Sequence, residues 1–184
     1  MGIQYFQQNF FKPLPIEPNS INLCIMSPPL LVFKKTKEIF GILNRYMDDT
    51  GWICIDAPAG YTPYDILLYE GVCFSLWTKY CHHFVKDCYT LGKDQCIHVY
   101  YKRGTRGHVC GVNRSISVNP NRQKRHSCEF CPDLIRTLID MYCEPGDTVL
   151  DGFCGTGTVM KVAEQMGRKG IGVDLRPMEN LYVN

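Results

Sequence analysis

The sequence lacks the features that mark a membrane or secreted protein. Its 184 residues contain no apolar run of the ~18 residues needed to cross a bilayer. No basic segment followed by an apolar stretch opens the chain, and internal repeats and low-complexity segments are absent. The composition, 45% hydrophobic and 21% charged, is typical of a globule that buries roughly 70% of its unfolded surface. These features predict a single intracellular, cytoplasmic domain over residues 1–184, with no membrane contact.

Cysteine is abundant, but a compact disulfide framework is missing. The eleven cysteines are an odd number, and several lie in apolar segments typical of core strands, such as Cys24, Cys54 and Cys96. Disulfides are rare inside cells, where a free cysteine behaves as a small core residue. We therefore predict reduced thiols, most of them buried.

A zinc site is the alternative interpretation for some of these cysteines. His108-x-Cys110 and His126-x-Cys128-x-x-Cys131 combine residue types that suit zinc. However, the sequence has no second Cys-x-x-Cys pair, which many zinc sites use. The favoured prediction is that the chain holds no metal.

Acidic residues are absent between Lys102 and Arg125, where seven Lys or Arg residues occur. The rest of the chain has 13 basic and 18 acidic residues, a net charge of −5. One basic segment on an acidic body favours a clamp for a polyanion such as nucleic acid, and a solvated loop is the alternative. The side chains expected to contact nucleic acid are Arg103, Arg106, Arg114, Arg122, Lys124 and Arg125.

A strand, a glycine-rich turn and a helix follow one another near the C-terminus. The expected strand ends at Leu150, just before Asp151, residues 152–158 form the turn, and an apolar helical pattern covers 159–166. Glycine lets the backbone approach a ligand closely, and the start of a helix offers unpaired N–H groups. This arrangement predicts a nucleotide-binding unit.

A second acidic residue supports the nucleotide interpretation. The next expected strand, 170–174, ends in Asp174, which is 19 residues past Gly155. This is near the ~20-residue spacing at which a carboxylate binds ribose hydroxyls; a plain cap of the strand end is the alternative. The third glycine of the dinucleotide fingerprint is replaced by Met160, which argues against NAD.

A pair of prolines ends another expected strand. Ser27-Pro28-Pro29-Leu30 directly follows the apolar segment 21–26. Two prolines cannot continue a central strand, so the tetrapeptide lies at its C-terminal end. Open α/β sheets bind their ligands at this edge.

The alternation of patterns along the chain predicts an α/β fold. Seven strands are expected, in a mostly parallel sheet that is covered by helices on both faces and includes one antiparallel hairpin strand. The expected strands are 3–6, 21–26, 52–56, 83–91, 95–101, a short strand ending at 150, and 170–174. Helices are expected over 34–47, 66–81 with Asp65 as its cap, 133–142 and 159–166.

The two motifs together resemble those of the DNA amino-methyltransferases. In this family Asp/Asn/Ser-Pro-Pro-aromatic is the catalytic tetrapeptide and Asp-x-Phe-x-Gly-x-Gly is the cofactor motif. The order here, with the catalytic motif first, resembles the permuted beta class. The resemblance implies a Rossmann-like methyltransferase fold, S-adenosylmethionine as cofactor, and methylation of N4 of cytosine or N6 of adenine in DNA.

The resemblance also implies which residues bind the cofactor. Asp174 would hold the ribose hydroxyls, and Asn9 would lie near the adenine. Ser27 would line the site, and so would His126 and Phe130, which belong to a segment similar to the family's leading cofactor motif. The methionine end would contact Asp151, Gly152, Phe153, Cys154, Gly155, Thr156, Gly157 and Thr158.

The catalytic residues implied are Ser27, Pro28, Pro29 and Leu30. The Ser27 hydroxyl and the Pro28 carbonyl would accept the two N–H bonds of the amine, so that a flipped-out base receives the methyl group by direct in-line transfer. Serine at the first position favours cytosine N4 over adenine N6. The Pro-Cys pair used for ring-carbon methylation is absent.

Leu30 departs from the family, which has an aromatic residue there to stack on the flipped base. Phe33, Tyr61 and Tyr64 are the candidates to supply a ring instead. RNA-base methylation and a silent nucleic-acid-binding relative are therefore the alternative functions. The short segment at about 102–127 predicts lax or short target recognition, or a homodimer that shares it. Restriction–modification with a cognate restriction enzyme, phage self-protection and regulation all fit.

Overall fold

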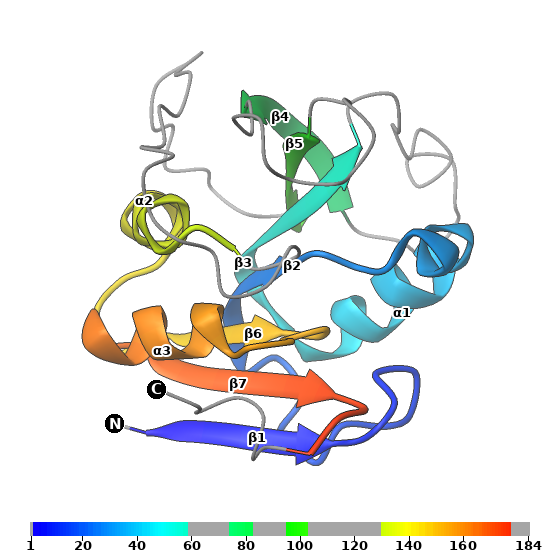
Figure 1. The fold of residues 1–184 in the computed structure, drawn as a ribbon, viewed down its shortest axis with the longest axis horizontal. Helices are drawn as coiled ribbons and strands as arrows, with labels where there is room; N and C mark the ends of the chain where they lie inside the picture. The colour runs from blue at the N-terminus through cyan, green and yellow to red at the C-terminus, as the bar shows by residue number, and fades with distance from the viewer. Residues whose placement is uncertain (1, 59–73, 83–94, 103–129, 178–184) are drawn as a thin grey trace.

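The computed structural model of this protein describes residues 2–58, 74–82, 95–102 and 130–177 (Figure 1). A 3-10 helix, η1, precedes the first α-helix. The described elements, in chain order, are β1 (Ile3–Gln7), β2 (Ile21–Met26), η1 (Leu30–Lys35), α1 (Thr36–Tyr46), β3 (Met47–Pro58), β4 (Phe74–His82), β5 (Gln95–Lys102), α2 (Pro132–Tyr142), β6 (Thr148–Asp151), α3 (Thr158–Gln165) and β7 (Lys169–Asp174).

The seven strands form one sheet in the order β1-β7-β6-β2-β3-β5-β4. Neighbouring strands are parallel from β1 to β3, whereas β5 is antiparallel to both β3 and β4. The predicted mostly parallel seven-stranded sheet with an antiparallel hairpin strand is confirmed. Because the chain moves outward in one direction from β6 to β7 and in the other from β2 to β3, the strand order reverses between β6 and β2.

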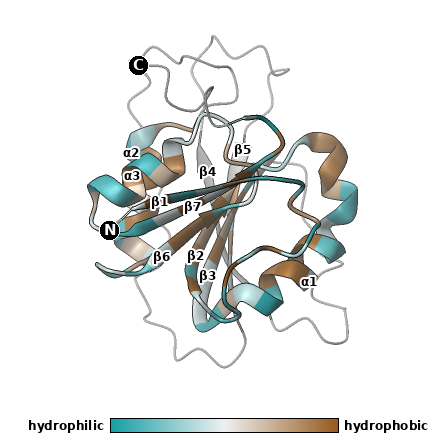
Figure 2. Ribbon diagram, turned by 90° about the horizontal axis from the view of Figure 1, so that it is seen from below, coloured by the Kyte–Doolittle hydropathy of each residue, from teal (hydrophilic) through white to brown (hydrophobic). Residues whose placement is uncertain are grey.

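Helices cover both faces of the sheet, as predicted (Figure 1). On one face α1 shares an apolar cluster with residues of β2 and β3, and on the other α2 packs against β2 and α3 against β6 and β7. The predicted helix over 133–142 is confirmed, and its apolar residues, three and four apart, share the face that turns inward. All four are buried: Leu134, Ile135, Leu138 and Ile139. Figure 2 shows hydrophobic residues along the central strands, between helices whose outer faces are hydrophilic.

The turn into β6 has the chemistry of its sequence. In Glu144-Pro145-Gly146-Asp147, Gly146 has a φ of 93°. The Asp147 amide donates to the Glu144 carbonyl at 3.2 Å, and the Asp147 carboxylate accepts from the Glu144 amide at 2.9 Å. Proline followed by a left-handed glycine is typical of a tight turn, and this turn places β6 against its neighbours.

The predicted helix over 66–81 is wrong in its described part, because Phe74–His82 is strand β4. The β4–β5 ladder skips Trp77, since Leu76 pairs with Tyr100 and Thr78 with Val99. A bulge of this kind interrupts the two-residue alternation by which a strand is recognised. The expected strand 83–91 and the expected cap Asp65 lie outside the described residues.

Strand β3 begins earlier than predicted. Residues before the expected strand 52–56 form a bulge within β3, because Ile21 pairs with Met47 and Leu23 already pairs with Trp52. The Asp48 carboxylate stabilises the bulge by accepting from the amide of Thr50 at 2.8 Å. This turn chemistry is local, but pairing with β2 keeps the segment in the sheet.

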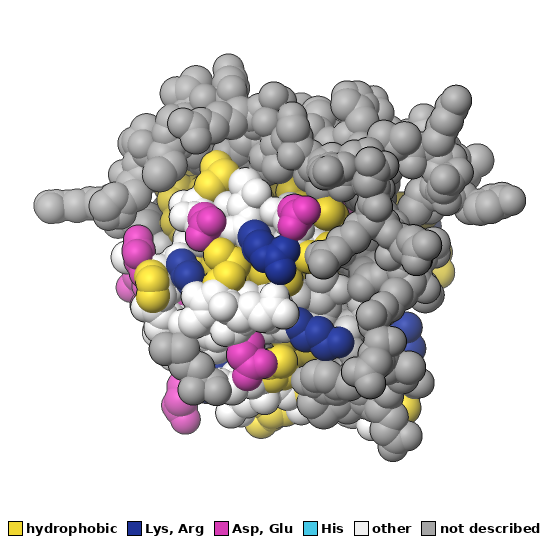
Figure 3. All heavy atoms as spheres, turned by 60° about the vertical axis from the view of Figure 1, so that its left-hand side comes forward, with side chains coloured by type: hydrophobic (Ala, Val, Ile, Leu, Met, Phe, Trp, Pro, Cys, Tyr) yellow, Lys and Arg dark blue, Asp and Glu magenta, His cyan; other side chains and the backbone are white. Residues whose placement is uncertain are grey.

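The helical face formed by α2 and α3 has mixed charge. Figure 3 shows basic and acidic side chains interspersed with apolar ones on this side of the molecule. Arg136 and Asp133 form an exposed ion pair at 2.8 Å there. Such a surface is typical of solvated helices. Among the described helices, none is long and apolar enough to cross a membrane.

Candidate active site

The two sequence motifs meet at the edge where the strand order reverses. Strands β2 and β6 are parallel neighbours, with Leu23 beside Val149 and Cys24 beside Leu150. Both therefore end on the same side of the sheet, where Ser27 follows β2 and Asp151 ends β6. In open α/β sheets this reversal point leaves a crevice for ligands.

Two glycines give the turn after β6 its shape. Gly155 and Gly157 have φ values of 53° and 76°, in the left-handed region that side chains rarely adopt. The Gly157 amide donates to the Cys154 carbonyl at 2.7 Å, and the Cys154 amide donates to the Val173 carbonyl at 3.1 Å. The turn is thus tied to β7, and Gly157 caps the start of α3.

Asp151 lies beneath this turn and is only 2% exposed. Its carboxylate accepts a hydrogen bond from the Phe153 amide at 3.0 Å. Burial raises the pKa of Asp151 to about 7 because it disfavours the charged form. A buried carboxyl with this pKa can lose its proton when a positively charged ligand binds beside it, because the ligand stabilises the charged form.

Phe10 supports the same turn from the N-terminal segment. Its ring is so close to Gly152 that a Cβ atom there would lie 2.6 Å from it. The Phe10 and Phe153 rings also pack with centroids 5.3 Å apart. The first glycine of the motif is thus required by packing, and its role was not apparent from the sequence.

Asp174 ends β7 with its carboxylate directed at the turn. It accepts from the Gly155 amide at 2.9 Å and from the Arg176 amide and Nε at 3.0 and 3.1 Å. Partial burial raises the pKa of Asp174, but the hydrogen bonds from Arg176 and Gly155 outweigh it and lower the pKa below its usual value. The Asp174 carboxylate is therefore charged, as binding of ribose hydroxyls requires. Arg176 already donates to one of its oxygens.

The Ser27 hydroxyl donates a hydrogen bond to Oδ2 of Asp56 at 3.3 Å. Asp56 lies near the C-terminal end of β3, next to β2, and is 5% exposed. The bond is long for two oxygens, as hydrogen bonds at reactive sites often are before a substrate binds. The Ser27 oxygen therefore presents its lone pairs as acceptors at the sheet edge. The buried Asp56 carboxylate polarises the hydroxyl.

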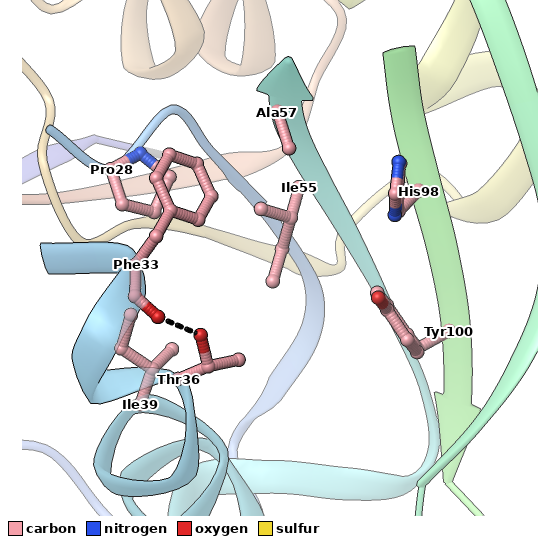
Figure 4. A pocket seen from close by; sticks show the side chains of 8 residues that line it. All are labelled: Pro28, Phe33, Thr36, Ile39, Ile55, Ala57, His98 and Tyr100. Carbon is pink, nitrogen blue, oxygen red and sulfur yellow. Dashed lines mark hydrogen bonds between the residues drawn. The ribbon is translucent and has the colours of Figure 1, made fainter. Parts of the chain in front are cut away.

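Pro28 borders a small apolar hollow between η1, α1 and the sheet (Figure 4). Phe33 is 7% exposed, and Figure 4 shows its ring next to Pro28. Leu30 does not line this hollow and has 71% of its surface exposed. Of the three candidate rings, Phe33 therefore lies beside the motif, and Tyr61 and Tyr64 lie outside the described residues. The hollow is lined by Pro28, Phe33, Thr36, Ile39, Ile55, Ala57, His98 and Tyr100.

The other residues predicted to bind the cofactor lie in three different parts of the structure. Asn9 follows β1, whose last residue, Gln7, pairs with Asp174. The side-chain Oδ1 of Asn9 accepts from the Phe11 amide at 3.0 Å. The hydroxyls of Thr156 and Thr158 are 3.1 Å apart. Phe130 packs on the apolar cluster under α2 and α3.

Several predictions concern residues outside the described ranges. His126 is one of them, together with the whole predicted nucleic-acid segment: Arg103, Arg106, Arg114, Arg122, Lys124 and Arg125. Of the proposed zinc ligands, only Cys131 is described, with a free thiol. The thiols of Cys24 and Cys54 are free and buried, and burial raises the pKa of each well above its usual value. The prediction of core thiols is confirmed for these two.

Sequence reasoning missed Asp56 and Arg176. The signal for Asp56 was present, because it stands at a strand end like Asp151 and Asp174. No local pattern marks its pairing with Ser27, which is 29 residues away. Arg176 follows Asp174 by two residues, a spacing with no characteristic meaning in a loop.

A comparison with protein families matches residues 17–180 to the DNA methylase family of N6 and N4 enzymes. The chain belongs to this family. Among curated members, the type II methyltransferase M.XycI of Xanthomonas campestris pv. cyanopsidis is 46% identical over 52 residues. M.MthZI of Methanothermobacter thermautotrophicus is 39% identical over 67 residues. These matches cover 28% and 36% of this chain, and only 17% and 18% of the two relatives.

Solved structures agree with the fold of this member of the N6/N4 family. The M1.HpyAVI–SAM complex superposes with a TM-score of 0.74, 17% identity, and 97% of each chain covered. The PvuII cytosine-N4-specific DNA methyltransferase gives a TM-score of 0.78 with 16% identity, covering 99% of this chain and 86% of its own. At such low identity the likeness shows the fold, and the predicted Rossmann-like methyltransferase architecture is confirmed.

Proposed function

We propose that this chain transfers a methyl group from S-adenosylmethionine to the exocyclic amine of a DNA base. The observation that carries the proposal is that Ser27-Pro28-Pro29 and the glycine turn after Asp151 end adjacent parallel strands. A catalytic motif and a nucleotide-binding turn are thereby held side by side at the point where the strand order reverses. Family membership supports the same reaction class.

The described residues fit this cofactor. The Asp174 carboxylate, beside Gly155, would hold the ribose hydroxyls, and the turn from Gly152 to Thr158 would hold the methionine end. S-adenosylmethionine supplies a methyl group that its positively charged sulfur makes electrophilic. The buried Asp151 carboxyl would lie close to the positive charge of the methionine end and would ionise in response. Leu175, next to Asp174 and 70% exposed, offers an apolar contact for the adenine ring.

Ser27 and Asp56 would act on the amine. An exocyclic amine is a poor nucleophile because its lone pair is delocalised into the ring. Hydrogen bonds from the amine to Ser27 Oγ and to the Pro28 carbonyl would turn the nitrogen toward the methyl group. As the new N–C bond forms, the amine loses one proton. Ser27 can take that proton and pass its own to Asp56, which its hydroxyl already contacts.

The target base is cytosine N4 in preference to adenine N6, because serine opens the catalytic tetrapeptide. The base must leave the duplex to reach Ser27. Because Leu30 replaces the aromatic residue, Phe33, beside Pro28, would have to turn out of its buried position to stack on the base. Tyr61 and Tyr64 are the other candidates for this role. The chain acts as one domain in this proposal, with DNA as its partner, and the basic segment 102–127 contacts the phosphates.

Two further partners belong to the proposal. A homodimer would compensate for the short recognition segment, and a cognate restriction enzyme fits the type II methyltransferases among the relatives. Both are separate from the chemistry and are tested separately, by the mass of the protein in solution and by protection of methylated DNA from cleavage.

The proposal is tested by tritium transfer from labelled S-adenosylmethionine to unmethylated duplex DNA, with nucleoside analysis of the product. N4-methylcytosine is expected, and Ser27→Ala should abolish it while still binding the cofactor. Ser20→Ala is the matched control, because Ser20 precedes the same strand at its other end and its hydroxyl donates to the Glu17 carbonyl, away from the sheet edge that carries Ser27. Label that enters RNA and not DNA, or cofactor binding with no transfer to either, would contradict the proposal.

A further inference from the structure

Two exposed leucines stand directly after the catalytic motif. Leu30 and Leu31 are 71% and 84% exposed and, with Leu175, are the large hydrophobic side chains most open to solvent in the described part of the chain. Burying a leucine side chain is favourable because it removes apolar surface from water, so two adjacent exposed leucines can add to the binding free energy when a partner covers them. Leu31 lies four residues beyond Ser27, in the short helix that directly follows the catalytic motif.

The leucines sit on a firm support. They begin η1, whose Phe33 is buried next to Pro28 (Figure 4). The Val32 amide donates to the Pro29 carbonyl at 2.7 Å, and the Thr36 hydroxyl donates to the Phe33 carbonyl. The two preceding prolines restrict the backbone further. Leu31 is therefore presented on a short, anchored helix whose position relative to Ser27 is set.

Positive charge follows the leucines. Lys34, Lys35 and Lys37 are exposed, and Glu38 pairs with Lys35 at 3.5 Å, so the stretch 34–38 has a net charge of +2. The Lys35 ammonium also lies 4.8 Å from the centre of the Phe11 ring. In Figure 2 the hydrophobic start of η1 gives way to this hydrophilic stretch.

An apolar tip backed by cations is complementary to nucleic acid, in which stacked bases lie between phosphates. Proteins that distort a duplex insert apolar side chains between bases in this way, and lysines near the insertion contact phosphates. A site that acts on a flipped base also leaves a gap in the stack. The gap must lie close to Ser27, because the flipped base remains joined to the strand.

We propose that Leu31 enters the DNA stack at the position that the target base leaves, while Lys34 contacts a flanking phosphate. The inference rests on the proposed function and adds a residue that opens the duplex without touching the reacting atoms. Leu31 stabilises the extruded state of a paired base. It contributes little where the base is already unpaired, because the cost of extrusion is then small.

The experiment compares two oligonucleotide duplexes that contain a site mapped in plasmid DNA methylated by the wild-type protein. In one the target base is paired, and in the other it faces a mismatched base. For Leu31→Ala we expect kcat/KM on the paired duplex to fall about tenfold or more, and on the mismatched duplex by less than about twofold. Leu31→Met, which keeps a similar apolar volume, should restore the paired duplex to within about threefold.

Each outcome decides between the possibilities. Equal losses on both duplexes, or no loss on the paired one, would overturn the role of Leu31 and leave the methyltransferase function intact. A wild-type protein that methylates no DNA would overturn the proposed function, and this inference with it. Unchanged cofactor affinity and melting temperature show that Leu31→Ala is folded, as its exposure predicts.

Discussion

The side chain of Met160 fills the space that a Cβ atom on Gly172 would need. Such an atom would lie 2.1 Å from the sulfur of Met160, and one on Gly170 would lie 2.9 Å from the Met160 Cα and carbonyl oxygen. Close helix–strand packing in a dinucleotide-binding unit usually depends on a glycine in the helix. Here α3 contributes the large side chain of Met160 and β7 contributes the glycines. The large and small residues at the contact between α3 and β7 are therefore on the opposite elements from the usual ones.

This exchange predicts how stability responds to substitution. Gly170→Ala and Gly172→Ala should each destabilise the fold by about 1–3 kcal/mol, the usual penalty for overpacking. Met160→Ala should relieve Gly172→Ala, whose clash is with the side chain. It should not relieve Gly170→Ala, whose clash is with the backbone. Urea unfolding of the single and double variants measures both effects.

The control for this series is Gly41→Ala in α1. A Cβ atom on Gly41 meets nothing within 4 Å, so alanine should stabilise the helix by about 0.5–1 kcal/mol. Equal relief of both β7 variants by Met160→Ala would show that the helix backbone does not approach Gly170 as closely as described.

Asp151 predicts a stability that depends on pH. Its pKa rises from the usual 3.8 to about 7 in the folded chain. Between these values the folded state holds a proton that the unfolded state has lost, so stability falls as pH rises from about 4 to 7. The loss is about 4 kcal/mol at most. Asp151→Asn should remove this component and be the more stable variant at pH 8, as measured by urea unfolding across pH.

The exposed Asp140→Asn, on α2, is the control for Asp151. It should leave the shape of the curve of stability against pH unchanged. The same ionisation predicts that the affinity for S-adenosylmethionine rises with pH up to about 7, because the positively charged ligand favours the ionised carboxyl. A cofactor affinity that does not vary with pH up to about 7 would show that Asp151 does not lie close to the methionine end of the cofactor.

Arg176 predicts a competition for the cofactor site. Its donors occupy the Asp174 oxygens that ribose hydroxyls would need. The Arg176 side chain of this ion pair is half-exposed, so the pair contributes about 0.2–1 kcal/mol. Arg176→Ala should therefore raise the affinity for S-adenosylmethionine about two- to fivefold. Asp174→Ala should weaken it by about tenfold or more. Calorimetric titration measures both affinities.

Arg45→Ala is the control for Arg176, because Arg45 lies in the last turn of α1, away from β7. Its cofactor affinity should equal that of the wild type. Weaker binding by Arg176→Ala would mean that the guanidinium contacts the cofactor directly and does not merely cover Asp174.

Substitution of Asp56 should lower the rate of methyl transfer without weakening cofactor binding. Asp56→Asn keeps the size of the side chain but cannot take the proton that Ser27 passes on. Methyl transfer should fall by about 10²–10⁴-fold, with cofactor affinity unchanged. Asp49→Asn, near the other end of β3, is the matched control. Activity retained by Asp56→Asn would assign Asp56 a purely structural role at the end of β3.

Local patterns explain why much of the fold was predictable. The apolar spacing in α2 determines its buried face, and the prolines after β2 end that strand wherever it lies in the sheet. Strand β4 shows the limit, because a bulge at Trp77 breaks the alternation and only pairing with β5 makes the segment a strand. The same holds for residues 48–51, whose turn chemistry is local but whose place in β3 depends on β2.

By itself, the sequence determined the chemical groups of this protein and their order: a serine before two prolines, an acid before a glycine turn, and a second acid at the next strand end. These are local features, encoded by spacing and backbone preference. Only the tertiary structure decided that Asp56 lies against Ser27, that Arg176 covers Asp174, and that Met160 faces two glycines. Those contacts depend on which strands are neighbours, and strand order arises from burial of the whole sheet between its helices.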